Sequence, residues 1–207
     1  MLHDNLNNFV AVINLLGIIA FAFSGALAAI RREVDVVGIP MLSLVACSFG
    51  GLTRDILIGD FPPELMRSNF ILGLAIASGI FARIFYDRLT RFHRVIDFFD
   101  ALGLGLFAVV GASKGLSFGI TPTWSVGLGL ITAVGGGVAR DILLAQVPSL
   151  LKSEIYANPA PLVALIFVAG TNPWPAKGNI FTAFGAVTAS GLRLLATPPN
   201  LHCRRLV

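Results

Sequence analysis

A short motif of consecutive glycines followed by an arginine and an aspartate occurs twice in this chain. The first copy is Gly50-Gly51-Leu52-Thr53-Arg54-Asp55, and the second copy, 86 residues later, is Gly136-Gly137-Val138-Ala139-Arg140-Asp141. A guanidinium binds carboxylates through paired hydrogen bonds, whereas a carboxylate attracts cations. The motif therefore offers the chemistry needed to hold an ion or a small charged ligand.

The glycines of both copies fall late in long apolar runs. Consecutive glycines weaken a helix by about 1 kcal/mol each relative to alanine. We therefore expect a kink or an unwound turn that directs backbone carbonyls toward a water-filled path, where they could coordinate a cation. The alternative is tight packing of two helices, which small residues also permit. The glycines concerned are Gly50, Gly51, Gly135, Gly136 and Gly137.

The charged residues of the motif need partners, because an ionised group at the centre of a membrane helix costs about 2.5 to 3.5 kcal/mol. Adjacent helical residues do not face each other, so Arg54 is not expected to pair with Asp55. We predict crosswise pairs between the copies, Arg54 with Asp141 and Arg140 with Asp55, near a pseudo-two-fold axis. The alternative places all four side chains at the headgroup level.

Further polar residues are weaker candidates. Four of them could line a path or tie helices together: Asn14, Ser24, Asp100 and Ser113. Lys114 is a further pore candidate, although a lysine at the end of a span is more often an interfacial anchor. A second group could contact lipid phosphates or simply set the topology: Lys152, Arg83, Arg88 and Arg91.

The composition indicates an all-α, polytopic membrane protein. Apolar residues make up 56% of the 207 residues and charged residues only 13%, against about 25% in a soluble domain. The apolar residues form runs that approach the roughly 20 residues needed to cross a bilayer. We predict seven spans, at residues 9–30, 36–58, 69–86, 96–115, 121–145, 155–171 and 179–197.

The distribution of Lys and Arg indicates how the chain is oriented in the membrane. The net charge of +4 does not indicate nucleic-acid binding, because Lys and Arg cluster in the short segments between apolar runs. Most of them fall on one side of the seven-span arrangement. The positive-inside rule therefore predicts an N-terminus outside the cell and a cytoplasmic C-terminus.

The repeat extends beyond the motif. At the same offset, Gly17 aligns with Gly103 and Asn14 with Asp100. Each copy contains three spans, and an odd number places the second copy in the membrane upside down relative to the first. We therefore expect a single membrane domain over residues 1–207 with a 3+3 inverted repeat and one C-terminal helix. Its parts are repeat one, 9–86, repeat two, 96–171, and the extra helix, 179–197.

No pattern in the chain predicts catalysis. The sequence contains no nucleophile placed with a base, no nucleotide-binding loop and no metal-ligand spacing. We expect neither an enzyme nor a cofactor, and no metal beyond transiently bound K⁺.

The doubled Gly-Gly-x-x-Arg-Asp motif, each copy followed by a proline at Pro62 or Pro148, resembles the prokaryotic trimeric intracellular cation (TRIC) channels. Members have also been labelled glycine transporters or uncharacterised membrane proteins. Short loops favour a prokaryotic member, so we expect a location in the cell (inner) membrane.

The resemblance implies a homotrimer with a pore inside each protomer, in contact with membrane lipid and passing monovalent cations, usually potassium. It also implies that helices two and five border the pore at Gly50, Gly51, Arg54, Gly136, Gly137 and Arg140. The alternative function is a secondary transporter for a small zwitterion such as glycine, in which Arg54 or Arg140 would bind the carboxylate.

Overall fold

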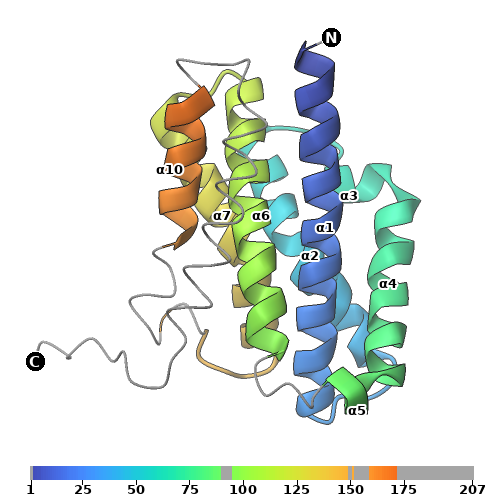
Figure 1. Ribbon diagram of the computed structural model, residues 1–207. Coiled ribbons are helices and arrows are strands. Elements are labelled where there is room, and N and C mark those ends of the chain that lie inside the picture. The colour runs from blue at the N-terminus through green and yellow to red at the C-terminus, as the bar shows by residue number, and fades with distance from the viewer. Residues whose placement is uncertain (1, 90–94, 149–150, 152–158, 172–207) are drawn as a thin grey trace, which may run out of the picture.

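The computed structural model describes residues 2–89, 95–148, 151 and 159–171, and the regular structure of these residues is helical (Figure 1). The long helices are the expected ones, because each apolar run satisfies its backbone hydrogen bonds internally. The elements are α1 (Leu2–Arg31), α2 (Gly38–Ile58), α3 (Glu64–Arg67), α4 (Asn69–Ile84), α5 (Tyr86–Leu89), α6 (Val95–Ser117), α7 (Pro122–Leu143) and α10 (Pro159–Thr171).

The predicted all-α membrane fold is confirmed. Within the part of the chain that the structure describes, four helices are long and apolar enough to cross a membrane, and α4 is a shorter apolar helix. The four long stretches are Val10–Arg31, Gly38–Ile58, Ile96–Ser117 and Pro122–Leu143. Part of the expected sixth span is α10, whereas the expected seventh span, 179–197, lies outside the described residues.

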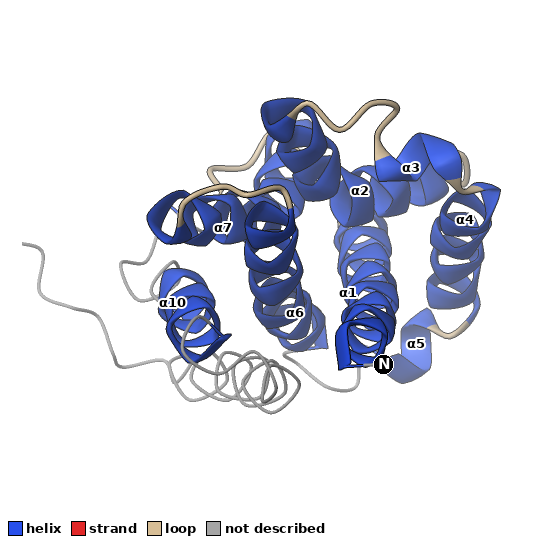
Figure 2. Ribbon diagram, turned by 90° about the horizontal axis from the view of Figure 1, so that it is seen from above, coloured by secondary structure: helices blue, strands red, loops and turns tan. Residues whose placement is uncertain are grey.

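The helices form two units of three that run in opposite directions. In the first unit α1, α2 and α4 pack together, and in the second α6, α7 and α10 do so. The units meet where α1 packs on α6 and α2 packs on α7, with α4 and α10 at the far sides (Figure 2). Both ends of the bundle therefore carry the end of one motif-bearing helix, α2 at one end and α7 at the other.

The glycines of the motif lie where α2 and α7 cross. A Cβ added to Gly50 would lie 2.1 Å from the carbonyl oxygen of Thr132, and one added to Gly136 would lie 1.9 Å from that of Ala46. These two contacts are equivalent, because Ala46 and Thr132 are separated by 86 residues, as Gly50 and Gly136 are. Both helices continue without interruption through the glycines. The expected unwinding is therefore absent, and close backbone packing explains the glycines.

The same symmetry joins α1 to α6. Phe107 fills the space beside Gly17, and Phe21 fills the space beside Gly103, with added Cβ atoms 2.5 Å and 2.7 Å from the rings. The two rings also pack on each other, with centroids 5.1 Å apart. The core between the repeats is therefore built from pairs of equivalent contacts.

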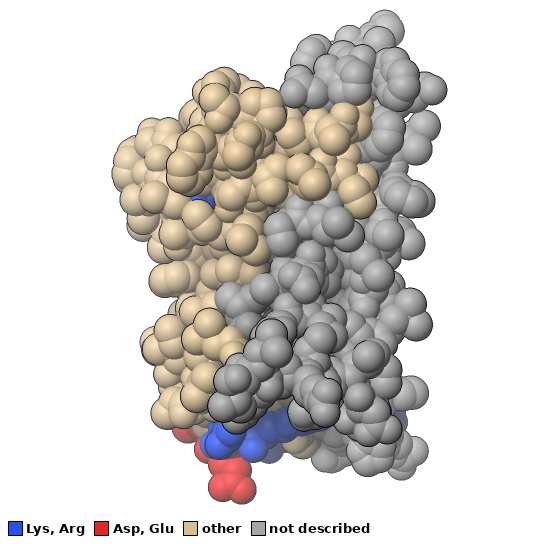
Figure 3. All heavy atoms as spheres, turned by 90° about the vertical axis from the view of Figure 1, so that its left-hand side faces the viewer, with Lys and Arg blue, Asp and Glu red and all other residues tan. Residues whose placement is uncertain are grey.

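The outer surface suits a lipid environment. Large apolar side chains such as Phe70, Ile80 and Leu143 are exposed. On the flank drawn in Figure 3, the charged side chains of the described residues gather almost entirely along the lower edge. Exposed apolar helices with charges at their ends are typical of membrane spans.

The α2–α7 crossing predicts that Gly50→Ala strongly destabilises the protein, by about 2 to 3 kcal/mol, because the new methyl would overlap a backbone carbonyl that has no rotamer to change. Thermal unfolding of the detergent-solubilised protein measures the effect. Gly73→Ala in α4 is the matched control, since nothing lies within 4 Å of the added Cβ. Equal melting temperatures for the two variants would contradict the packing role of Gly50.

Candidate functional site

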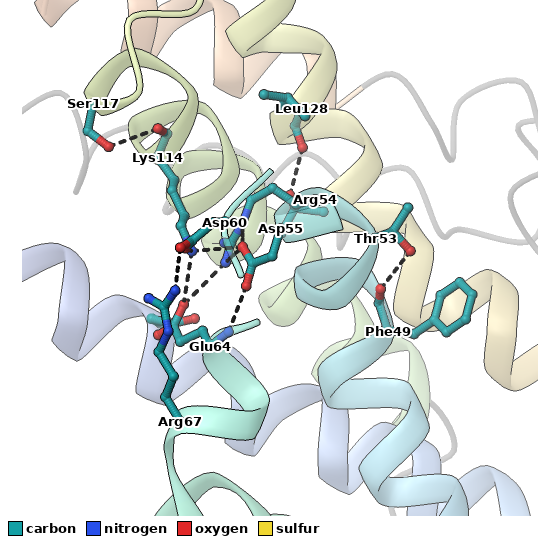
Figure 4. Close-up of polar contacts among 12 residues, drawn as sticks. Phe49, Thr53, Arg54, Asp55, Asp60, Glu64, Arg67, Lys114, Ser117 and Leu128 are labelled. Carbon is teal, nitrogen blue, oxygen red and sulfur yellow. Dashed lines mark hydrogen bonds and ion pairs between the residues drawn. The ribbon is translucent and has the colours of Figure 1, made fainter. Parts of the chain in front are cut away.

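The first motif forms a buried charge cluster at the C-terminal end of α2 (Figure 4). The Nε of Arg54 donates a hydrogen bond to Oδ1 of Asp55 at 2.9 Å, and Nη2 lies 2.7 Å from the same oxygen. Nη2 also donates to Oε2 of Glu64, the first residue of α3, at 3.2 Å. The side chains of Arg54 and Asp55 are only 2% and 1% exposed. We call this group the Arg54 cluster. Its members are Asn14, Arg54, Asp55, Asp60, Glu64, Arg67 and Lys114.

Lys114 enters the Arg54 cluster from α6 (Figure 4). Its Nζ lies 2.7 Å from Oδ1 of Asp55, 2.7 Å from Oδ2 of Asp60 and 3.9 Å from Oε2 of Glu64. Asp60 also pairs with Arg67. Hydrogen bonds from Lys114 first, and from Arg67 next, lower the pKa of the Asp60 carboxyl below its usual range.

The second motif forms another cluster, at the opposite end of the bundle. Arg140 reaches its neighbour Asp141, with Nε to Oδ1 at 2.9 Å, and donates from Nη1 to Oδ1 of Asp100 in α6 at 2.8 Å. Nη1 also donates to the hydroxyl of Ser24 in α1, which in turn donates to Asp100 at 3.3 Å. These four residues, the Arg140 cluster, are all buried.

The predicted crosswise pairing is wrong. Each arginine pairs with the aspartate next to it in the chain, because the long side chain curls back over the neighbouring residue. Arg54 and Arg140 follow the crossing glycines in antiparallel helices, so inverted topology carries them to opposite ends. Arg54 and Arg140 are buried among helices, so neither side chain extends outward as the headgroup alternative expected.

Each cluster adjoins a cavity, and the two cavities differ in size. The cavity at the Arg54 end has a volume of about 30 Å³, enough for roughly one water molecule. It is lined by Asn14, Cys47, Arg54, Glu64 and Leu65 among others. The cavity at the Arg140 end has a volume of about 290 Å³, with Arg31 and Arg32 joining Asp100, Arg140 and Asp141 in its lining. The cavity at the Arg140 end is therefore the wider of these two.

The remaining sequence candidates have mixed outcomes. Asn14 belongs to the Arg54 cluster, since its Nδ2 donates to Oε1 of Glu64 at 2.8 Å. Ser113 is half-buried on α6 and takes part in the hydrogen bonds of neither cluster. Arg83 and Arg88 are exposed, and Arg88 lies 5.8 Å from the ring centroid of Phe85. Lys152 and Arg91 lie outside the described residues, so the lipid contact stays a prediction.

Sequence reasoning missed three members of the Arg54 cluster, namely Asp60, Glu64 and Arg67. The available signal was Lys114 itself, because an ammonium inside an apolar run requires carboxylates nearby. Three acidic residues follow in close succession at the end of the second span, at positions 55, 60 and 64. Their spacing covers a turn rather than a helix, so helical periodicity did not group them.

Comparisons with known proteins agree with this geometry. A family model described as "Glycine transporter" matches residues 11–87 and again 97–172. The chain belongs to this family. Both matched stretches carry one motif and three apolar runs, so one model describes the two repeats separately.

Other members of the family are similar along most of their length. A UPF0126 membrane protein of Deinococcus radiodurans is 37% identical over 150 residues, which are 72% of this chain and 70% of that protein. The UPF0126 inner membrane protein YadS of Escherichia coli is 26% identical over 185 residues, 89% of each chain.

Solved structures confirm the resemblance to TRIC channels. The TRIC trimeric intracellular cation channel orthologue from Rhodobacter sphaeroides matches with a TM-score of 0.86 and 30% identity, covering 90% of this chain and 96% of that one. A prokaryotic TRIC channel crystallised in 0.5 M KCl matches with a TM-score of 0.82 and 34% identity, covering 90% and 94%. The chain is thus a TRIC-like member of the glycine transporter family.

The Arg140 cluster predicts a large loss of stability for Arg140→Leu. Removing the guanidinium breaks the ion pairs of two buried carboxylates, Asp100 and Asp141, and breaking a buried pair costs about 3 to 5 kcal/mol. Thermal unfolding in detergent again provides the measurement. The exposed Arg83→Leu is the control, and a melting temperature for Arg140→Leu equal to that of this control would contradict the assignment.

Proposed function

We propose that the protein is a channel for monovalent cations, with potassium as the main ion and a pore inside each protomer of a homotrimer. The solved neighbours are named cation channels, and one is named trimeric, which supports this class of function. The observation that carries the proposal is the pair of charge clusters at opposite ends of one inter-repeat contact, each beside a cavity.

Charged side chains line both cavities, in different arrangements. At the Arg140 end, Arg140 lies between the buried carboxylates of Asp100 and Asp141, and Arg31 and Arg32 also line the wide cavity. The Arg54 cluster is balanced, with three carboxylates facing Arg54, Arg67 and Lys114. A cation entering from the Arg140 end would meet the exposed Arg31 and Arg32 before the buried carboxylates, and at the narrow end it would meet carboxylates that three basic groups balance.

The two ends carry different residues at equivalent positions of the repeat. At the 86-residue offset, Lys114 corresponds to Ala28, Asp60 to Gln146 and Glu64 to Leu150. Among the residues that the structure describes, a lysine held by several carboxylates is found at the Arg54 end. A channel needs one gate, whereas alternating access needs closure at each end in turn. This asymmetry favours the channel over a transporter.

A transporter of a small zwitterion such as glycine is the second candidate, and the description of the family model favours it. In that function Arg54 or Arg140 would bind the substrate carboxylate. Both guanidiniums already hold two carboxylates of the protein, Asp55 and Glu64 in one case, Asp100 and Asp141 in the other. A substrate would have to displace one of them, which makes this alternative the weaker one.

The channel proposal predicts unitary potassium currents when the purified protein is inserted into planar bilayers. The currents should appear in KCl alone and reverse at the potassium equilibrium potential in a KCl gradient. Addition of glycine should leave them unchanged. Glycine-dependent flux into proteoliposomes, without unitary steps, would establish the transporter instead.

Lys114→Met is expected to raise the open probability of the channel, roughly tenfold, because charge-assisted hydrogen bonds of about 1.5 to 3 kcal/mol then no longer hold the narrow end closed. Single-channel recording at fixed voltage measures the change. Ser117→Ala, one turn further along α6, is the matched control. An unchanged open probability in Lys114→Met would remove Lys114 from the gate.

A further inference from the structure

The segment that joins α2 to α4 lies beside the cavity at the Arg54 end (Figure 2). It contains α3, which packs against both α2 and α4. Glu64 and Leu65, its first two residues, line the cavity of about 30 Å³ together with Cys47 of α2. The segment is therefore a wall of that cavity as well as a connection between two helices.

Glu64 fastens this segment to three long helices. Its Oε1 accepts from Asn14 of α1 at 2.8 Å, its Oε2 accepts from Arg54 of α2 at 3.2 Å, and Oε2 also lies 3.9 Å from Nζ of Lys114 in α6. Its backbone N–H donates to Oδ2 of Asp55 at 2.9 Å. Among the described residues, no other member of α3 has side-chain bonds to all three of these helices.

The side chain of Glu64 differs from the charges that it contacts. It is 41% exposed, whereas Arg54 is 2% exposed and Lys114 is 18% exposed. A half-exposed carboxylate can leave its partners and regain water at small cost, whereas a buried charge that loses its partners cannot. Glu64 is thus better suited to opening than Arg54 or Lys114, the charges that it contacts.

We propose that the segment from Gly59 to Ser68 is a strap over the narrow end and that Glu64 is the latch that holds it closed. Release of Glu64 from Asn14 and Arg54 lifts Glu64 and Leu65 from the cavity and exposes its interior. The effect of this release on conduction rests on the proposed function, but the opening of the strap itself does not.

The second repeat indicates how the latch can be changed. Asn14 corresponds to Asp100, which binds the arginine of its own repeat directly. An aspartate at position 14 would stand within hydrogen-bond distance of Glu64 and repel it while competing for Arg54. Asn14→Asp therefore weakens the latch by repulsion, whereas Glu64→Gln weakens it by removing its charge.

Cys47 supplies a reporter that does not depend on ion flow. It lines the same cavity and is 2% exposed, so its modification by a small methanethiosulfonate reagent requires the cavity to open. The test uses the full-length protein in detergent with Cys203→Ser, which leaves Cys47 as its single cysteine. The rate of modification is followed by intact-protein mass spectrometry.

Glu64→Gln and Asn14→Asp should each raise the rate of Cys47 modification about fivefold or more over the Cys203→Ser background, since each weakens a charged hydrogen bond of a half-exposed group. Glu33→Gln, the same change at an exposed carboxylate between α1 and α2, should leave it unchanged. Combining Asn14→Asp with Glu64→Gln should return the rate toward the background, because a glutamine amide can donate to the new aspartate.

Three results would overturn the latch. They are unchanged rates in both single variants, an equal rise in Glu33→Gln, or a double variant as fast as the sum of the singles. Gel filtration and melting temperature identify a variant that is merely unfolded, and the other single variant then decides. A faster Cys47 reaction without potassium currents in any variant would refute the channel and retain the strap.

Discussion

The close approach of two backbones at Gly50 and Gly136 is the constraint on which the rest of the structure depends. Neither position has room for a methyl group, so α2 and α7 are fixed at their crossing. Because the helices are antiparallel, everything that follows the glycines in one repeat points away from its counterpart in the other. The positions of Arg54 and Arg140 at opposite ends are therefore consequences of a packing contact, and the two cavities follow from those positions.

The two repeats share their helix arrangement but differ in the residues that bind their arginines. Both arginines bind the next aspartate in the chain, which reflects the common origin of the two repeats. The second carboxylate comes from different places: Glu64 lies after the motif, whereas Asp100 lies on the first helix of its repeat. Asn14, the counterpart of Asp100, is neutral, so the first repeat needs a carboxylate from the strap. A connecting segment can supply such a partner and withdraw it, whereas a packed helix cannot.

The sequence allowed the fold to be predicted well and the site only in part. Apolar runs and the 86-residue offset are one-dimensional patterns, and membrane helices follow them closely because lipid leaves the backbone no alternative. The crosswise pairs failed because the offset identifies equivalent residues without stating how far apart inversion places them. The reach of Arg54 to Asp55 depends on a rotamer, and the convergence of Asp60 and Glu64 on Lys114 depends on the path of a turn. Neither the rotamer nor the path of the turn leaves a periodic pattern in the sequence.

The charged side chains of the two clusters differ in solvent exposure. This difference indicates which of them hold the helices together and which can move. Arg54 and Arg140 direct their donors to two carboxylates each and are buried, so moving either would strand charges in a medium of low dielectric constant. Lys114 and Glu64 meet in the same cluster but retain contact with water, with exposed fractions of 18% and 41%. Water can replace their partners as they separate. The arginines are therefore suited to hold the helices in place, and Glu64, the more exposed of the other two, is better suited to move than Lys114.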